Sequence, residues 1–573
     1  LVPMKRRNSG NNGYLGIDKV TNPTTGKLSS SKIYNIGVRE NSYNQFGNTA
    51  NAFGMVSGNY QRPTEWQALP GVTAGSQQIV GLFAVYDNDT NVCGLRIQGA
   101  YQVNWGDGTS NTYANDAIAV KRYDRTTYAG LTSSVFRNYK TVLLTVTPQA
   151  GQTFTSVQFS PAVSGTVSGY SSINMTNWLD IRMAGSSIST LTVSAWAGSS
   201  IYSGMLEQFE FVGTAVLTSF IFIDCRSLRR IISFPSTRLV TNWQSIFYGC
   251  RALQEIPRPA LDGLLTGNAS PYAYTFYQCF SLKHLPIEIM DCRSTTSVNG
   301  TFVSCFNLQR VPQFINTQNV TDFNSVFSGC MSIEEVPFFD TTKNTNFYGM
   351  FYQCFSLKYL PSALTGASGT NFQYMFYNCI QLKTLPYIDT KNGTNFSDFV
   401  RDCYSLETIP QYDFASATNL TRFAYQSSNL KYIPDFKNST SAITNMDSAF
   451  YACQSLIEAP GITTSNVTNI TSLFNSCNSL KTIPTYDFSK VTTSSTPFSS
   501  TGSLISVGIS GCSFSVSYAS NTLGATALNS IYSSLATVGI SGAAARTITV
   551  SGNWGTATDT PEIAIGKGWT VTG

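Results

Sequence analysis

The residues able to act as catalytic acids, bases or nucleophiles are few and scattered. The chain has one histidine, His284, which we expect at an outward position of a repeated strand. A serine or cysteine nucleophile needs an adjacent base, and no spacing pairs one with His284. A glycosidase needs two carboxyls about 5 to 9 Å apart, and no pair stands out among Glu334, Glu335, Asp340, Asp402 and Glu407. We therefore expect no enzymatic activity.

Ten of the thirteen cysteines occupy one position of a repeat, and only Cys93, Cys292 and Cys512 lie outside it. The ten are Cys225, Cys250, Cys279, Cys305, Cys330, Cys354, Cys379, Cys403, Cys453 and Cys477. The sequence lacks the Cys-x-x-Cys pairs of structural zinc sites. We expect a ladder of buried free thiols that behave as small apolar side chains, with disulfides or metal as the alternative.

One further segment has the composition of a cation site. Asp87–Asn91 is an oxygen-rich turn, but it lacks the full pattern of a calcium-binding loop. We expect a plain hairpin turn there, and we expect the chain to hold no cofactor and no metal.

A series of tyrosines is the best candidate for a binding surface. Each follows a repeated phenylalanine: Tyr248, Tyr277, Tyr352, Tyr377 and Tyr451. If the repeats stack, these side chains align into a stripe, and tyrosine combines an apolar ring with a polar tip that suits sugar or protein surfaces. Packing between neighbouring repeats remains the alternative explanation of the same pattern.

The element that must position these residues is a repeat of about 25 residues. Its clearest copy, Phe376–Pro386, reads Phe-x-x-Cys-x-x-Leu-x-x-Leu-Pro, and the cysteines of neighbouring copies lie 24 to 29 residues apart. Apolar residues three apart favour a short helical turn, followed by a short strand that ends at the proline. A unit this small cannot bury its own apolar face, so we expect about 12 coils stacked into a solenoid.

Composition excludes several classes of protein. Charged residues make up 12% of the 573 residues, and the net charge is only +5, which argues against a nucleic-acid partner. No apolar run reaches the 18 or so residues of a membrane-spanning helix, so we expect no membrane insertion. The basic start Lys5-Arg6-Arg7 is not followed by an apolar segment, so we expect no secretion signal.

The repeat resembles the BspA-like leucine-rich repeats, the 26-residue repeats of bacterial surface proteins, which share the Phe-x-x-Cys-x-x-Leu core. The resemblance covers about residues 215–507. It implies a leucine-rich-repeat solenoid, and it leaves function open because such repeats occur in adhesins, lipoproteins and phage virion proteins.

The remainder of the chain suggests three further parts. Tyr101–Thr109, with its Trp-Gly-Asp-Gly-Thr sequence, and the later Val142–Thr147 resemble a PKD-like β-sandwich of the immunoglobulin type. We therefore expect a mainly β protein with four parts. They are an extended N-terminal arm (1–75), the sandwich (76–165), the solenoid (166–520) and a C-terminal cap (521–573) with a helix at 526–535 and a strand at 547–550.

These features together favour a virion protein. The glycine-rich basic start Arg6–Gly16 resembles the N-termini of structural proteins of tailed phages. We expect a tail or baseplate appendage on the virion that docks on other virion proteins through its arm, while the solenoid recognises a host-surface glycan or protein. The alternatives are a purely architectural capsid or tail decoration protein and a bacterial cell-surface adhesin. An oligomer is compatible with all three.

Overall fold

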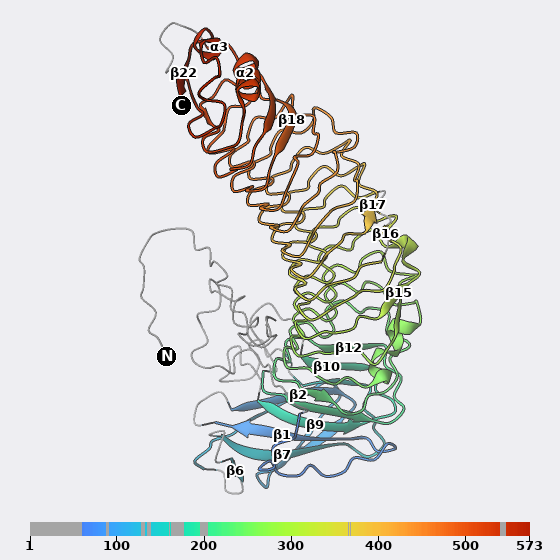
Figure 1. Cartoon of the computed structure of the whole chain (residues 1–573). Helices are drawn as coiled ribbons and strands as arrows, with labels where there is room; N and C mark the ends of the chain where they lie inside the picture. Colours follow the sequence, from blue (N-terminus) through green and yellow to red (C-terminus); the bar gives the residue numbers. More distant parts are fainter. Residues whose placement is uncertain are drawn as a thin grey trace, which may run out of the picture. The chain divides into compact units, whose positions relative to one another are not determined.

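The computed structural model describes residues 60–573 except 87–90, 128–131, 135–138, 160, 162–176, 195–203, 362, 365, 367 and 539–545. The described residues belong to one compact unit. Its regular structure is mainly β, and its two large sheets lie at the N-terminal end of a stack of coils (Figure 1). Most of the predicted N-terminal arm, with Lys5, Arg6 and Arg7, lies outside the described residues.

Two mixed sheets are built from the first thirteen strands. The larger has the order β13-β11-β9-β1-β7-β3-β4, with β6 also paired to β7, and the smaller has the order β12-β10-β8-β2-β5. The bounds in the larger sheet are β1 Gln78–Val85, β3 Tyr101–Asn104, β4 Ser110–Tyr113, β6 Thr132–Ser134, β7 Tyr139–Pro148, β9 Trp178–Ala184, β11 Gln208–Val212 and β13 Arg230–Ile231. Those in the smaller are β2 Val92–Gln98, β5 Ile118–Arg122, β8 Ser156–Gln158, β10 Thr190–Ser194 and β12 Ser219–Phe222.

Both sheets change from antiparallel to parallel pairing as they enter the coils. In the larger sheet β1 pairs antiparallel with β7 and β9, whereas β9, β11 and β13 pair parallel. In the smaller sheet β2 pairs antiparallel with β5 and β8, whereas β8, β10 and β12 pair parallel. Strand pairing therefore crosses the predicted boundary at residue 165, and one apolar core runs from the sheets into the coils.

Residues 60–69, which the sequence assigned to the arm, pack on the other face of the larger sheet. Trp66 and Leu69 are buried there against strand residues. The indole N–H of Trp66 donates to the Tyr139 hydroxyl at 2.9 Å, and Arg62 forms an ion pair of 2.7 Å with the fully buried carboxylate of Asp180. This part of the chain is a covering segment of the sheet.

Successive coils are joined by backbone hydrogen bonds at every second residue around the repeated phenylalanine. In one coil the N–H groups of Phe372, Tyr374, Phe376 and Asn378 donate at 2.8 to 3.1 Å to the carbonyls of Asn395, Ser397, Phe399 and Arg401. The sequence predicts a helical turn here, but the structure has consecutive turns. Left-handed residues two before and two after the phenylalanine, such as Tyr374 (φ 58°) and Asn378 (φ 61°), prevent a helix.

The repeated phenylalanines form the spine of the core. From Phe247 to Phe376 the ring centroids of consecutive copies lie 5.5 to 6.1 Å apart, and their planes agree within 15°. These are favourable offset-stacking distances. Each ring thus buries a face against the coil on either side, which gives the stack a continuous apolar interior.

Regular strands and helices are short and sparse along the coils and become denser in the last part of the chain. The remaining elements are η1 Arg258–Leu265, β14 Ile289–Asp291, β15 Gln313–Ile315, η2 Thr317–Asn319, β16 Ala363–Leu364, β17 Tyr387–Ile388, β18 Thr482–Asp487, β19 Ser506–Ser510, β20 Val516–Ser517, α2 Ala525–Ser534, β21 Arg546–Thr549, α3 Glu562–Ile565 and β22 Trp569–Thr572. Helix α2 and strand β21 lie where the sequence predicts a helix and a strand. Strands β20, β21 and β22 form a parallel sheet near the C-terminus.

Candidate binding surface on the stacked coils

The ladder cysteines are buried free thiols that join neighbouring coils. Nine of them donate a hydrogen bond from Sγ, at 3.0 to 3.3 Å, to a carbonyl of the coil before: Cys250, Cys279, Cys305, Cys330, Cys354, Cys379, Cys403, Cys453 and Cys477. Ser427 replaces cysteine in one copy, and its hydroxyl donates in the same way to the Val400 carbonyl at 2.6 Å. The position therefore needs a small donor as well as a small apolar side chain.

The remaining cysteines are also free and buried: Cys93, Cys225, Cys292 and Cys512. Burial raises the pKa of the Cys93, Cys292 and Cys512 thiols, to about 12 for Cys512. A thiol with such a pKa is protonated at neutral pH, and a protonated thiol is a poor nucleophile and a poor metal ligand. The chemistry of these cysteines is therefore structural.

Two substitutions at Cys379 should distinguish its role as a hydrogen-bond donor from its role as a small apolar side chain. Cys379→Ala removes the hydrogen bond to the Phe351 carbonyl and should lower the free energy of unfolding by about 1 kcal/mol. Cys379→Ser keeps a donor, as Ser427 does, and should cost less. Urea unfolding of the two variants measures the difference. Equal losses would show that the sulfur acts by its volume alone.

The predicted tyrosines stack in pairs at one position of the coils, and this position is named here the tyrosine column. Tyr248 stacks on Tyr277 with ring centroids 4.6 Å apart, and Tyr352 stacks on Tyr377 at 4.8 Å. Tyr451 stacks at 4.6 Å on Tyr425, which the sequence analysis missed. The facing rings cover each other, so much of each ring is used in packing between coils.

Arg401 is a second member of the tyrosine column that the sequence analysis missed. Its guanidinium lies 5.2 Å from the ring centroid of Tyr377 and 4.7 Å from that of Tyr425. Cation–π contacts of this length are favourable, and more so where water is excluded. Both Arg401 and Tyr425 directly follow a replaced phenylalanine, Val400 or Ala424. Arg401 lies 24 residues after Tyr377, and Tyr425 lies 24 residues after Arg401, so the repeat spacing alone identifies both.

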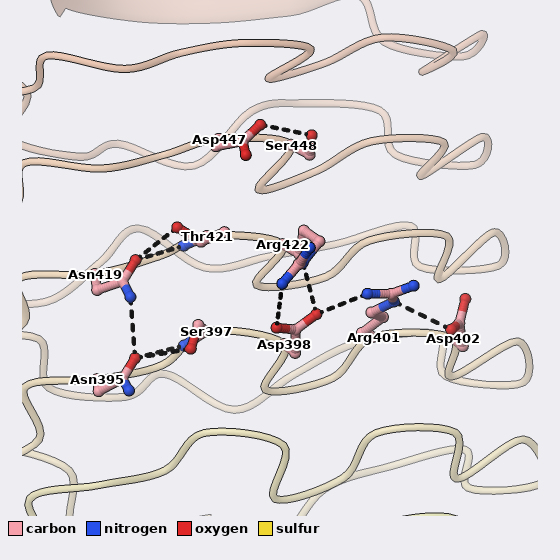
Figure 2. Close-up of polar contacts among 10 residues, drawn as sticks. All are labelled: Asn395, Ser397, Asp398, Arg401, Asp402, Asn419, Thr421, Arg422, Asp447 and Ser448. Carbon is pink, nitrogen blue, oxygen red and sulfur yellow. Dashed lines mark hydrogen bonds and ion pairs between the residues drawn. The ribbon is translucent and has the colours of Figure 1, made fainter. Parts of the chain in front are cut away.

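The carboxylates of Asp398 and Asp402 form ion pairs with the Arg401 guanidinium and hold it in place (Figure 2). The carboxylate of Asp398 is fully buried and accepts from Arg401 Nη1 at 3.0 Å and from Arg422 Nε at 2.9 Å. Arg401 Nε also pairs with Asp402 at 3.3 Å. Burial alone would lower the pKa of Arg401, but the hydrogen bond to Asp398 raises it overall. Burial raises the pKa of Asp402.

Asparagines on the same coils fix the turns that lead into the column (Figure 2). The side-chain oxygen of Asn395 accepts from the backbone N–H of Ser397 at 3.1 Å, and that of Asn419 accepts from Thr421 at 3.0 Å. Asn419 Nδ2 donates to Asn395 Oδ1 at 3.2 Å. Such turns compete with helix formation, and the stacked asparagines keep successive coils in register.

A hollow of about 320 Å³ opens beside the column, lined by Tyr348, Tyr352, Tyr374, Tyr377 and Arg401. The Tyr374 ring lies edge-on to Tyr352 and Tyr377, with centroids 6.0 and 5.9 Å away. Burial raises the pKa of Tyr377 to about 12, and its hydroxyl is neutral at physiological pH, as an ordinary tyrosine hydroxyl also is. The hollow therefore offers ring edges and phenol groups to a ligand that can accept and donate hydrogen bonds.

The other candidate residues are dispersed over the surface. His284 is exposed, as predicted. Glu334 pairs with Lys358 at 2.8 Å and Glu407 with Lys431 at 3.2 Å. Glu335 is exposed, and Asp340 accepts from the Thr342 backbone N–H at 2.8 Å. Glu334 and Glu407 thus serve as ion-pair partners, and Asp340 caps a turn.

Metal and membrane features are reported only for the part of the chain that the structure describes. Within it, no group of three or more histidine, cysteine or acidic side chains is placed to hold a metal ion. Residues 87–90 of the predicted hairpin turn lie outside that part. No described helix has both the length and the apolar character needed to cross a membrane.

Comparison with known proteins relates the repeats to one family. Three overlapping segments, 270–387, 366–459 and 418–515, match the family described as "Mycoplasma protein of unknown function, DUF285". The chain thus contains DUF285 repeats. No curated protein matches the chain.

Two solved structures similar to this chain are leucine-rich-repeat or receptor proteins. One is a leucine-rich repeat protein from Eubacterium ventriosum ATCC 27560, with 17% identity, a TM-score of 0.32, and coverage of 61% of this chain and 92% of that one. The other is the plant peptide hormone receptor RGFR1 in complex with RGF2, with 11% identity, a TM-score of 0.18, and coverage of 65% and 67%.

Proposed function

We propose that the chain is a non-enzymatic structural protein of a bacteriophage virion, a tail or baseplate appendage whose BspA-like solenoid of about 12 coils displays a recognition surface to the host. The observation that carries this proposal is the tyrosine-lined hollow beside Arg401. Aromatic and arginine side chains are the residues enriched where proteins bind partners. Here they are held rigidly, because ring stacking and the Asp398 ion pairs fix them before any ligand arrives.

The rest of the chain supports a role in display. Stacked coils present the same side-chain position at a regular interval, which suits an extended recognition surface. The sheets at the N-terminal end share the core of the coils, so a load applied there would be carried into the stack. Residues 1–59 would dock on other virion proteins.

Binding of the purified chain to host cells tests the proposal. We expect the chain to bind and to compete with the particle for adsorption. A double variant with Tyr348→Ser and Tyr374→Gly should bind at least about tenfold more weakly, because the loss of two contact tyrosines removes about 1.4 kcal/mol or more. Glycine is chosen for Tyr374 because its φ of 58° is left-handed.

The matched control is Tyr248→Ser with Tyr277→Ser, which alters a stacked pair of the same column outside the hollow. It should bind host cells as the unmodified chain does. A chain that binds particles stripped of it but not host cells would be a decoration protein, and the recognition proposal would fail. Mass spectrometry of purified particles checks that the chain is a virion component.

A further inference from the structure

One junction of the stack lacks the usual hydrogen bonds between coils. At the junction before it, the N–H group of Phe474 donates to the Pro497 carbonyl at 2.8 Å, and the N–H groups two residues to either side donate to the same coil in the same way. In the coil that accepts these bonds, which the structure describes in full, the N–H groups of Thr496, Phe498 and Ser500 take part in no hydrogen bond. Three backbone donors at alternate residues are therefore open at this edge.

A shortened repeat explains the interruption. Tyr518 takes the phenylalanine position of the next coil, since its ring stacks on that of Phe498 with centroids 5.1 Å apart. It follows Phe498 by only 20 residues, whereas the earlier copies of this position lie 24 to 29 residues apart. The short coil thus meets Phe498 in the core but does not pair with the edge. Beyond it the pairing resumes, because the N–H group of Tyr518 donates to the Thr549 carbonyl at 2.8 Å.

A groove of about 720 Å³ lies at this junction. It is lined by the three residues with open donors, by β20, and by Thr547 and Thr549 of β21. None of its lining residues is charged, and most of their side chains carry a hydroxyl. Open backbone donors at alternate residues are the groups to which an added β-strand binds, and burying a charge in such a groove is costly. The groove therefore suits an uncharged, extended polypeptide segment.

The edge with the open donors bends at two defined places. Thr496 and Ser500 have left-handed φ values of 50° and 59°, so a segment that pairs along this edge needs two such bends four residues apart. Glycine adopts a left-handed φ without strain. Among the glycines of residues 1–59, only Gly54 and Gly58 stand four residues apart. The sequence thus singles out one segment of this chain as the occupant.

The segment Phe53–Gly58 matches the coil pattern at further positions. Its Gly54-Met55 sequence repeats Gly349-Met350, which directly precedes a repeated phenylalanine. Val56 then stands at the phenylalanine position, as Val400 does in a described coil. A small side chain suits this position, because the ring of the coil above already stacks on the coil below. The segment also carries no charged side chain, as the lining of the groove requires.

The segment that reaches the groove must belong to a second copy of the chain. Tyr60, which follows the segment, lies under the guanidinium of Arg229, 5.8 Å from its ring centroid. About 270 residues separate Arg229 from Phe498, which at about 25 residues and about 4.8 Å per coil amounts to about 50 Å of stack. Gly54 lies six residues before Tyr60, and an extended chain of that length spans only about 20 Å.

We infer that Phe53–Gly58 of one chain docks in the groove of a second copy, where its carbonyls accept from the open N–H groups of Thr496, Phe498 and Ser500. The contact is heterologous, because the segment and the groove are different surfaces, so it joins copies head to tail. The inference goes beyond the proposed function, since it names a site of self-association and stands whether or not the chain is part of a virion.

Sedimentation velocity of the full chain over a range of concentrations tests the inference. We expect dimers and longer oligomers as the concentration rises. Ser499→Trp fills the groove and should weaken association, and the coil accepts a large ring there because Tyr377 and Tyr451 occupy the same position. Ser499→Ala is the matched control and should associate as the unmodified chain does. Gly54→Val with Gly58→Val should weaken association at least about tenfold, because valine resists a left-handed φ.

A mixture of the two weakened variants identifies the contact as head to tail. The Ser499→Trp chain keeps its segment and the double valine variant keeps its groove, so an equimolar mixture should form dimers but no longer oligomers. A full chain that stays monomeric, variants that associate like the unmodified chain, or a mixture without dimers would overturn the inference. Retention of a different protein by the groove, without self-association, would also overturn it. Thermal unfolding shows whether each variant is folded, and Ser499→Tyr replaces the tryptophan variant if that one is not.

Discussion

Above about pH 9 the chain should unfold over a narrow pH range. Burial raises the pKa of eleven thiols: Cys93, Cys279, Cys292, Cys305, Cys330, Cys354, Cys379, Cys403, Cys453, Cys477 and Cys512. In the unfolded chain a thiol ionises near pH 8.5. Because the folded state keeps these protons and the unfolded state loses them, the fold is destabilised as pH rises.

The size of this effect follows from the number of thiols. A raised folded-state pKa contributes stability that is fully present below the unfolded pKa and is lost between that value and the folded pKa, here about 12 for Cys453. Each thiol costs about 1.4 kcal/mol per pH unit in that window. Eleven together reach about 15 kcal/mol per unit, which matches the whole stability of a typical domain.

Circular dichroism and thiolate absorbance, recorded together between pH 8 and 11 under reducing conditions, provide the measurement. Both signals should change at the same pH, since a thiol can ionise only when its coil opens. A variant with four ladder cysteines replaced by serine should show a shallower transition. Thiolate absorbance that rises near pH 8.5 while the dichroism stays constant would contradict the buried ladder.

The stacked coils were predictable because the residue pattern of one coil recurs at a nearly constant spacing in the sequence. The cysteine and phenylalanine positions recur every 24 to 29 residues, and a repeat too short to bury its own apolar face must stack. One copy of the repeat has Ser427 where the others have cysteine, and this difference was informative about the role of the position. Serine is a poor apolar substitute but a good donor, so the exchange pointed to the hydrogen bond that the structure shows.

Contacts between segments far apart in sequence were not predictable in this way. Strand β1 pairs with β9, about 100 residues away, and an alternating apolar pattern does not name the partner of a strand. The pattern therefore predicts a separate sandwich, whereas in the structure both sheets continue into the coils. The covering segment at 60–69 was missed because its anchor, Asp180, lies on the same distant strand.

The hollow beside the tyrosine column was missed for a local reason. Tyr348 and Tyr374 precede the repeated phenylalanine by three and two residues, so they do not fall at the position that the pattern follows. Tyr374 also adopts a left-handed φ of 58°, which is uncommon for a bulky side chain. No propensity rule would have placed its ring against Tyr352 and Tyr377.

Asp398→Asn should lower the stability of the stack far more than any exposed charge substitution. The Asp398 carboxylate is fully buried and neutralises both Arg401 and Arg422. The substitution removes the Asp398 ion pair of Arg422 and leaves Arg401 paired with Asp402, and breaking a buried ion pair costs about 3–5 kcal/mol. Asparagine keeps the size of the side chain and tolerates the left-handed φ of 55° at this position. The loss therefore reports on charge rather than on backbone strain.

Glu407→Gln is the matched control, because Glu407 and Lys431 also pair between neighbouring coils but are 54% and 55% exposed. It should cost less than about 1 kcal/mol. Urea unfolding compares the two variants without changing the ionic strength. If Asp398→Asn costs no more than Glu407→Gln, the buried network is not a stabilising feature of the coils.

The damage from Asp398→Asn should stay near the affected coils. In a solenoid each repeat contacts only its neighbours, so a weakened junction divides the stack into two less strongly coupled parts. Hydrogen exchange should speed up at N–H groups that cross this junction, such as Asp398 to the Thr421 carbonyl and Asn378 to the Arg401 carbonyl. Distant crossings, such as Phe276 to the Thr301 carbonyl, should keep their protection. Uniform loss along the chain would show that the coils unfold as one cooperative unit, and the hollow beside Arg401 would then be supported by the whole stack rather than by its own ion pairs.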